Sequence, residues 1–331
     1  MGRKVVVLGA TGRFGRAAIS AFGNAGWTVR AFSRSVPDPR PAGVQEWMTG
    51  EAHDRDTVVR AAESCDVIVN ALNPPYPSWR RDLPVFTRNV IAAAWRSGAT
   101  VMLPGNVYNY GAGMPSVVSE ETPHRPTTRK GRLREEMEQS YARCGGIRTV
   151  VLRAGDFIDG RKTGNWLENH ILAGLAVGRV MYPGPLDRVH AWAYLPDMAA
   201  AMAGLAERRH AFADFEEFGF PGFALTGQEL VAAAEQAAGR SLKVGGMPWP
   251  LVRVAGLVSP LMREVAEMAY LWKVPHRVDG TKLALTLPQV KTTPLDEVMA
   301  MVVETLAGHP ARENNQQLKG AANGAMASDL P

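Results

Sequence analysis

The feature that most constrains the fold is an apolar run followed by three evenly spaced glycines near the start of the chain. Residues 5–8 lead into Gly9, Gly12 and Gly15 in the stretch VVVLGATGRFG. In a strand–turn–helix unit, such glycines permit a tight turn, a close backbone approach to a pyrophosphate, and close packing of helix on strand. The first amides of the helix then face the phosphates. The pattern predicts a dinucleotide-binding fold.

The rest of the first 155 residues alternates short apolar strands with longer amphipathic stretches, which is typical of a parallel sheet with crossover helices. We predict an α/β fold, namely a Rossmann-type doubly wound parallel sheet with a smaller C-terminal substrate lobe. The sheet domain would comprise residues 1–155, with 190–215 returning to it, and the lobe would comprise 156–189 and 216–309. Strands are expected at residues 4–8, 28–32, 66–71, 100–103 and 149–153.

Two helix starts and the end of the chain also carry local signals. Thr226 followed by Glu229 predicts a capping box, and Asp197 after Pro196 predicts an N-cap. Residues 310–331 are polar and rich in small residues, so a disordered tail is expected there.

Composition narrows the class of protein. The formal net charge is +5, and the charged residues are spread along the sequence without a block of like charges. No nucleic-acid partner is therefore expected. No apolar run reaches the roughly 18 residues of a membrane span, and no secretory signal precedes the first strand. We therefore expect a cytoplasmic monomer or homodimer that acts on a small molecule without a membrane partner. The two cysteines and the scattered histidines predict no disulfide and no metal site.

The residues after the second predicted strand bear on the choice of cofactor. NAD-binding loops usually place a carboxylate there for the ribose 2′-hydroxyl, but this chain has Ser33 and Arg34 and no acid until Asp38. Arg13 lies within the glycine loop. A 2′-phosphate is recognised by guanidinium groups and hydroxyl donors, so NADPH is predicted, with NAD as the less favoured cofactor.

The glycine spacing with TG in its middle resembles that of the extended and atypical short-chain dehydrogenases/reductases, the group that includes NAD(P)-dependent epimerases and dehydratases. DVIVNAL, NVIAAAWRSGAT and AWAYLPDMAAAMAGL extend this resemblance over about residues 4–305. The resemblance implies a Rossmann fold with a nicotinamide cofactor. The predicted cofactor contacts are Gly9, Thr11, Gly12, Arg13, Phe14, Gly15, Ser33, Arg34, Ala71, Leu72, Pro104, Gly105 and Gly155.

The usual catalytic residues of that family are absent. Its members typically carry Tyr-x-x-x-Lys with a serine or threonine, and none of the seven tyrosines here has a lysine four residues later. Pro104, Gly105 and Asn106 stand where the serine is expected after the fifth strand. The departure puts ordinary ketone–alcohol chemistry in doubt.

Two side chains are candidates for the missing acid. Lys130, Leu133, Arg134 and Glu138 fit K-x-x-[IL]-R-x-x-x-E, which resembles the isoflavone, pinoresinol and phenylcoumaran benzylic ether reductases. That resemblance implies an acid/base role for Lys130, whose pKa burial would lower; the alternative is one more solvated cation. Tyr108 follows the fifth strand, whose carboxyl end should lie beside the nicotinamide. Asn106 would orient a substrate oxygen or form a turn.

The lobe should supply the substrate contacts, although aromatic residues there are more often plain core. His190 would be a packed histidine. Basic residues that could meet a diphosphate, namely Arg161, Lys162, Arg179 and Arg188, are not clustered. The predicted substrate contacts are Tyr110, Asp156, Phe157, Trp166, Trp192 and Tyr194.

Three functions remain open at this point. The leading one is an NADPH-dependent reductase of a small, aromatic or apolar carbonyl or enone, with Lys130 or Tyr108 handling the proton. The alternatives are a nucleotide-sugar epimerase or dehydratase, and a non-catalytic NADP(H) sensor similar to the NmrA regulators.

Overall fold

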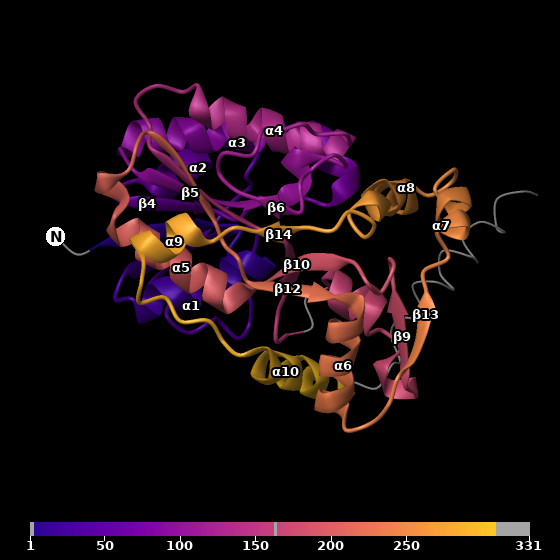
Figure 1. Ribbon diagram of the computed structural model, residues 1–331. Coiled ribbons are helices and arrows are strands. Elements are labelled where there is room, and N and C mark those ends of the chain that lie inside the picture. The colour runs from indigo at the N-terminus through magenta and orange to yellow at the C-terminus, as the bar shows by residue number, and fades with distance from the viewer. Residues whose placement is uncertain (1–2, 162–163, 309–331) are drawn as a thin grey trace, which may run out of the picture.

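A seven-stranded sheet in the order β11-β7-β5-β4-β1-β2-β3 forms the centre of the computed structural model, which describes residues 3–161 and 164–308 (Figure 1). Every pair of neighbouring strands in this sheet is parallel. The order reverses beside β1, as in a doubly wound fold. The strands are β1 (Lys4–Leu8), β2 (Thr28–Ser33), β3 (Glu46–Thr49), β4 (Val67–Asn70), β5 (Thr100–Asn106), β7 (Thr149–Ala154) and β11 (Phe215–Gly219).

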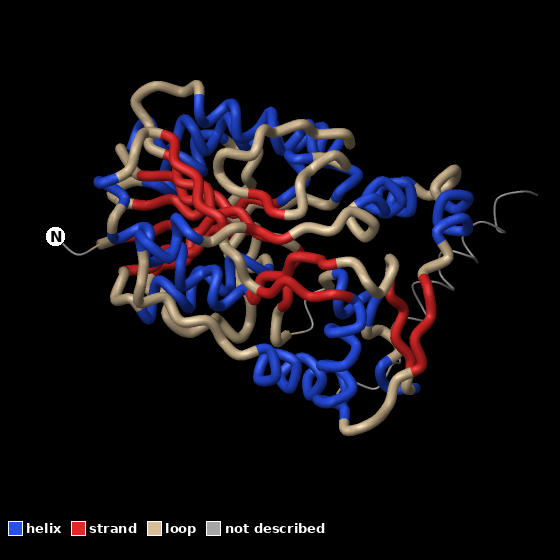
Figure 2. Tube along the Cα trace, in the orientation of Figure 1, coloured by secondary structure: helices blue, strands red, loops and turns tan. Residues whose placement is uncertain are grey.

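Helices cover both faces of this sheet (Figures 1 and 2). One layer holds α1 and α5, which pack against each other, and the other holds α2, α3 and α4. The predicted fold class is therefore confirmed. The helices are α1 (Arg13–Asn24), α2 (Arg55–Ala62), α3 (Trp79–Ser97), α4 (Arg129–Ala142) and α5 (Leu195–Glu207).

The sheet differs from the sequence prediction at its edges. The prediction missed β3, because none of its four residues is buried and it therefore carries no apolar run. β5 continues to Asn106, three residues beyond the predicted end, because Pro104–Asn106 still pair with β7.

The second lobe is built on small sheets. β10 (Val189–Tyr194) pairs with β8 (Asp156–Ile158) and β12 (Phe223–Thr226), while β9 (Arg179–Tyr182) pairs with β13 (Lys243–Gly246). β6 (Val117–Val118) pairs with β14 (Arg277–Val278). The helices are α6 (Gly227–Ala238), α7 (Trp249–Ala255), α8 (Pro260–Glu267), α9 (Thr281–Thr286) and α10 (Leu295–Ala307).

The two parts of the chain interleave more than the sequence suggests. β11 was assigned to the second lobe from residue 216 onward, yet it is an edge strand of the main sheet, and α9 lies against it. The predicted tail at 310–331 lies outside the described residues. Among the helices that the structure describes, none is long and apolar enough to cross a bilayer.

The two predicted helix starts have different outcomes. Thr226 and Glu229 form the expected capping box at α6. The prediction for Asp197 is wrong, because Tyr194 occupies the N-cap of α5 and Asp197 lies in the first turn. Its carboxylate instead accepts hydrogen bonds from the Thr293 amide and hydroxyl, at 2.6 and 2.8 Å. Asp197 thus ties α5 to the segment before α10.

Candidate functional site

The glycine turn between β1 and α1 leaves no room for side chains. Gly9 has a φ of +80°, and a Cβ there would lie 2.7 Å from the Ala71 carbonyl oxygen. A Cβ on Gly15 would overlap the carbonyl of Gly9. The turn therefore brings α1 against the carboxyl ends of β1 and β4, where dinucleotides bind in this fold.

The start of α1 is open to an anion. Gly12 is the N-cap and supplies no side chain to the first amides, and the first turn contains no acidic residue. The unpaired N–H groups and the helix dipole at such a terminus favour a phosphate. Arg13 lies at this opening, half-buried, while Thr11 is exposed and Phe14 is buried in the core.

Because a methyl group at position 15 would collide with backbone, Gly15→Ala should cost about 1–3 kcal/mol of stability and weaken NADPH binding by about tenfold or more. Gly145→Ala is the matched control, since nothing lies within 4 Å of its added Cβ. Cofactor titration and urea unfolding of both variants measure the two effects. Wild-type NADPH affinity in Gly15→Ala would contradict this account of the turn.

Beyond β2, the side chains that could meet an adenosine ribose are polar or basic. The Ser33 hydroxyl donates to the Ser35 carbonyl (2.6 Å) and accepts from the Trp47 indole (3.1 Å). Arg34 is exposed, and its guanidinium has no hydrogen-bond or ion-pair partner among residues 3–161 and 164–308. A free guanidinium here suits a phosphate better than a bare ribose hydroxyl.

Tyr108 lies at the carboxyl end of β5 in the short helix η2 (Val107–Tyr110), and it is 7% exposed. Its hydroxyl lies 3.4 Å from that of Tyr76, which begins η1 (Tyr76–Ser78) after β4. Burial raises the pKa of Tyr108 well above its usual 10. The phenol therefore stays protonated at neutral pH and can act as a proton donor.

Lys130 also lies beside Tyr76, but its ammonium is paired with carboxylates of α8. Its ammonium lies 5.1 Å from the Tyr76 ring centre and bonds the carboxylates of Glu264 (2.5 Å) and Glu267 (2.6 Å) and the Glu264 carbonyl (2.8 Å). Burial lowers the pKa of Lys130, and Glu267 opposes that shift. The ammonium donates hydrogen bonds to the Glu264 carbonyl and the Glu267 carboxylate, and it forms an ion pair with the Glu264 carboxylate, so Lys130 fixes α8 against α4.

Arg134 is a site residue whose role the sequence analysis missed. It lies four residues after Lys130, at the spacing of the family's Tyr-x-x-x-Lys, and that spacing was the available signal. Its guanidinium is buried, bonds Asn73 at 3.0 Å and lies 4.5 Å from the Trp79 ring centre. Burial raises the pKa of Tyr76, and the positive charge of Arg134 is among the smaller effects that oppose this shift.

The remaining residues predicted at the end of β5 are used in hydrogen bonds or packing within the protein. The Asn106 side chain accepts from the Tyr108 amide at 2.9 Å and so caps η2. Gly105 is packed against Val151, and Pro104 is half-buried. The Tyr110 hydroxyl donates to the Ser119 carbonyl at 3.1 Å.

Asp156 follows Gly155 at the carboxyl end of β7, where a Cβ on Gly155 would overlap the Ala191 carbonyl of β10. The Asp156 carboxylate lies 2.9 Å from Nε2 of the buried His190. Burial makes the largest contribution to the raised pKa of Tyr108, and the charges of Tyr76 and Asp156 add to it. Sequence reasoning treated His190 only as a packing residue.

Aromatic rings surround the Asp156–His190 pair. His190 stacks on Trp272 with ring centres 4.2 Å apart, and Trp272 also contacts Trp192 at 5.9 Å and Trp166 at 5.2 Å. Two other predicted contacts lie elsewhere. Phe157 packs on the main core, and Tyr194 directs its hydroxyl at the Met301 sulfur (3.6 Å) beside α10.

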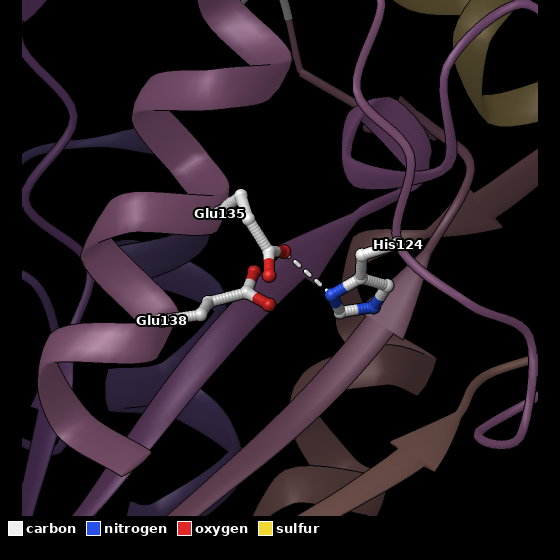
Figure 3. Close-up of side chains that lie close together, drawn as sticks. All are labelled: His124, Glu135 and Glu138. Atoms are coloured by element: carbon white, nitrogen blue, oxygen red, sulfur yellow. Dashed lines mark ion pairs between the residues drawn. The ribbon is translucent and has the colours of Figure 1, made fainter. Parts of the chain in front are cut away.

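Charged side chains of α4 and of the segment before it lie close together (Figure 3). His124, Glu135 and Glu138 bring potential ligand atoms within 4.8 Å of one another, which no sequence spacing indicated. Nδ1 of His124 pairs with Glu135 at 2.5 Å. Glu138 bonds the Arg153 guanidinium at 2.7 and 3.2 Å, so an arginine already supplies positive charge to this cluster.

The parallel sheet, the glycine turn and the open end of α1 together define a dinucleotide-binding protein of the Rossmann class. Residues 5–218 match the family model for the NAD dependent epimerase/dehydratase family, and the chain belongs to that family. The likeness of the Lys130 segment to the isoflavone reductase group stays a prediction.

Solved structures agree on the fold. A UDP-glucose 4-epimerase from Brucella ovis in complex with NAD is 16% identical, with a TM-score of 0.73 over 92% of this chain and 99% of that one. The Bifidobacterium longum UDP-glucose 4-epimerase in complex with NAD⁺ and UDP is 15% identical, with a TM-score of 0.71 over 93% and 99%. At these identities the likeness shows the fold alone. A search of curated proteins finds no match.

Proposed function

We propose that this chain is an NAD(P)-dependent hydride-transfer enzyme that reduces a small, apolar or aromatic carbonyl or enone. The hydride would come from the nicotinamide of a dinucleotide whose pyrophosphate is bound at the glycine turn, and Tyr108 would protonate the substrate oxygen. The observation that carries the proposal is the part-buried pair of the Tyr108 and Tyr76 hydroxyls in the segments that follow β5 and β4, whose charge environment includes Arg134.

Between the two predicted acids, the contacts favour Tyr108. The Lys130 ammonium donates two hydrogen bonds to α8 and pairs with both carboxylates there, whereas the Tyr108 hydroxyl has only the neighbouring phenol of Tyr76 in the part of the chain that the structure describes. A phenolate formed by proton donation would be stabilised by Arg134, since opposite charges lower a phenol pKa.

The second candidate is a nucleotide-sugar epimerase or dehydratase, which the comparisons favour over a reductase. The lobe gives this candidate less support. A sugar nucleotide carries a diphosphate, which would need basic side chains gathered in the lobe to bind it. Arg161, Arg179 and Arg188 are exposed, and Lys162 lies outside the described residues. The carboxylate of Asp156, on the wall of the lobe, would repel phosphate. A non-catalytic sensor remains the third candidate.

One assay separates the three candidates. Purified protein with NADPH or NADH is mixed in turn with phenylacetone, an aromatic enone, UDP-glucose and UDP-glucuronic acid. Loss of nicotinamide absorbance with the ketone or enone supports the proposal. Conversion of a UDP-sugar without net cofactor change supports the epimerase. Tight NADPH binding without turnover of any of these compounds contradicts both and favours the sensor.

NADPH is the proposed cofactor, because the structure leaves Arg34 free beside the end of β2 and supplies no carboxylate there. Arg34→Ala should weaken NADPH binding by about tenfold, the value of one charge-assisted contact, and leave NADH binding unchanged. Arg40→Ala, a nearby exposed arginine, is the control. Titration of both nucleotides measures the preference, and an unaltered NADPH/NADH ratio in Arg34→Ala would overturn the cofactor assignment.

A further inference from the structure

The helical hairpin α7–α8 exposes an apolar surface that the proposed function does not use. Five of its large apolar side chains are more than half exposed, at 51 to 88%, within eleven residues. Isolated exposed apolar residues are ordinary, but a contiguous group of them marks an interaction site. The group, which we call the hairpin patch, comprises Leu251, Val254, Leu257, Val258 and Leu261.

The charged residues within and just before the hairpin patch in the sequence are all basic. From Gly239 to Arg263 the sequence contains no aspartate or glutamate, but it contains Arg240, Lys243, Arg253 and Arg263. Lys243 and Arg253 are exposed. The acidic residues of α8 begin at Glu264, and Glu264 is buried in its contact with Lys130. An apolar surface with exposed cations beside it is complementary to an anionic lipid surface.

The position of the hairpin in the molecule also suits contact with a lipid surface. α7 lies at the outer edge of the molecule, with α8 between it and the body of the protein (Figure 1). The patch is therefore carried on a projection. A projecting apolar tip can enter the boundary between headgroups and acyl chains, and its cations then meet the headgroups.

We propose that the hairpin patch binds the surface of an anionic bilayer. The expectation of no membrane partner came from the lack of a span-length apolar run. Here the apolar residues belong to two short helices and form one surface only after folding. Such binding needs no spanning helix, and it stands independently of the enzymatic activity.

The hairpin also adjoins the candidate site. A cavity of about 170 Å³ between η1, α4 and α8 is lined by Tyr76, Lys130, Pro260 and Arg263, among others. Glu264 and Glu267 of α8 hold Lys130 next to Tyr76. If the proposed function also holds, membrane binding would place the site at the source of an apolar substrate.

Vesicle co-sedimentation tests the proposal on the full chain. We expect the protein to bind vesicles of mixed phosphatidylcholine and phosphatidylglycerol, to bind pure phosphatidylcholine weakly, and to lose affinity as salt is raised. The double variant Leu257→Asp/Val258→Asp should lower partitioning by about tenfold or more. Both side chains are exposed, so the fold should persist, which circular dichroism checks.

The matched control is Leu285→Asp/Val177→Asp, which adds the same charge at side chains that are 80 and 71% exposed but lie outside the hairpin. It should keep most of the partitioning. Equal loss in both double variants would show general electrostatic attraction and overturn the proposal. Absence of vesicle binding would also overturn it, and a wild-type dimer that only the hairpin variant dissociates would assign the patch to a second copy of the chain.

Discussion

Tyr108→Phe is expected to lower kcat for carbonyl reduction by about 10²–10⁴-fold, the usual contribution of a positioned general acid. The substitution removes one hydroxyl from a buried ring and leaves the ring's packing in place, so NADPH affinity should be unchanged. Because burial raises the pKa of Tyr108, the donor stays protonated across neutral and mildly alkaline pH. Wild-type kcat should therefore show no loss from ionisation of this phenol between about pH 6 and 9.

Two further variants make this result specific. Tyr141→Phe also removes a buried hydroxyl, but that hydroxyl bonds Asn70 within the core at 3.0 Å, so turnover should persist. Lys130→Met tests the rival acid, since it breaks the contact between α4 and α8 without touching the Tyr108 hydroxyl. Steady-state kinetics with phenylacetone and NADPH measure all three. If Lys130→Met abolishes kcat in a folded protein and Tyr108→Phe does not, Lys130 is the acid.

Arg153→Met is expected to lower the free energy of unfolding by about 3–5 kcal/mol, the cost of breaking a buried ion pair from one side. The Arg153 guanidinium is 2% exposed and bonds Glu138 and Glu217, each at 2.7 Å, as well as the Asn106 carbonyl at 2.8 Å. Burial alone would lower the pKa of Arg153, but the two carboxylates raise it overall. Methionine fills a similar volume and leaves both acids without their partner.

Urea unfolding gives this loss directly. Arg188→Met is the control, because Arg188 is half exposed and its pair with Asp187 spans 3.5 Å at the surface. Its effect should stay within about 0.5 kcal/mol. Adding Glu138→Gln to Arg153→Met should recover part of the loss, since it removes one of the two unpaired charges. A loss below 1 kcal/mol in Arg153→Met would mean that water or a cation satisfies these carboxylates.

Local sequence patterns were sufficient to predict much of the sheet domain. Gly9, Gly12 and Gly15 define the turn through steric limits that act between near neighbours, and the apolar run before them defines β1. The capping box of Thr226 and Glu229 is likewise contained within four residues. β3 was missed because an exposed edge strand has no burial pattern, and Asp197 was misassigned because its partner, Thr293, is 96 residues away.

The sequence by itself determined the Rossmann architecture and the glycine turn between β1 and α1, because strand periodicity and the steric limits of glycine act among residues that are close in the sequence. Only the tertiary structure decided what surrounds the substrate. Tyr76 meets Tyr108, His190 meets Asp156 and Lys130 meets Glu264 across 32 to 134 residues. Such pairs form where crossover helices and loops return to one edge of the sheet. The spacing of residues along the chain does not predict which side chains will meet there.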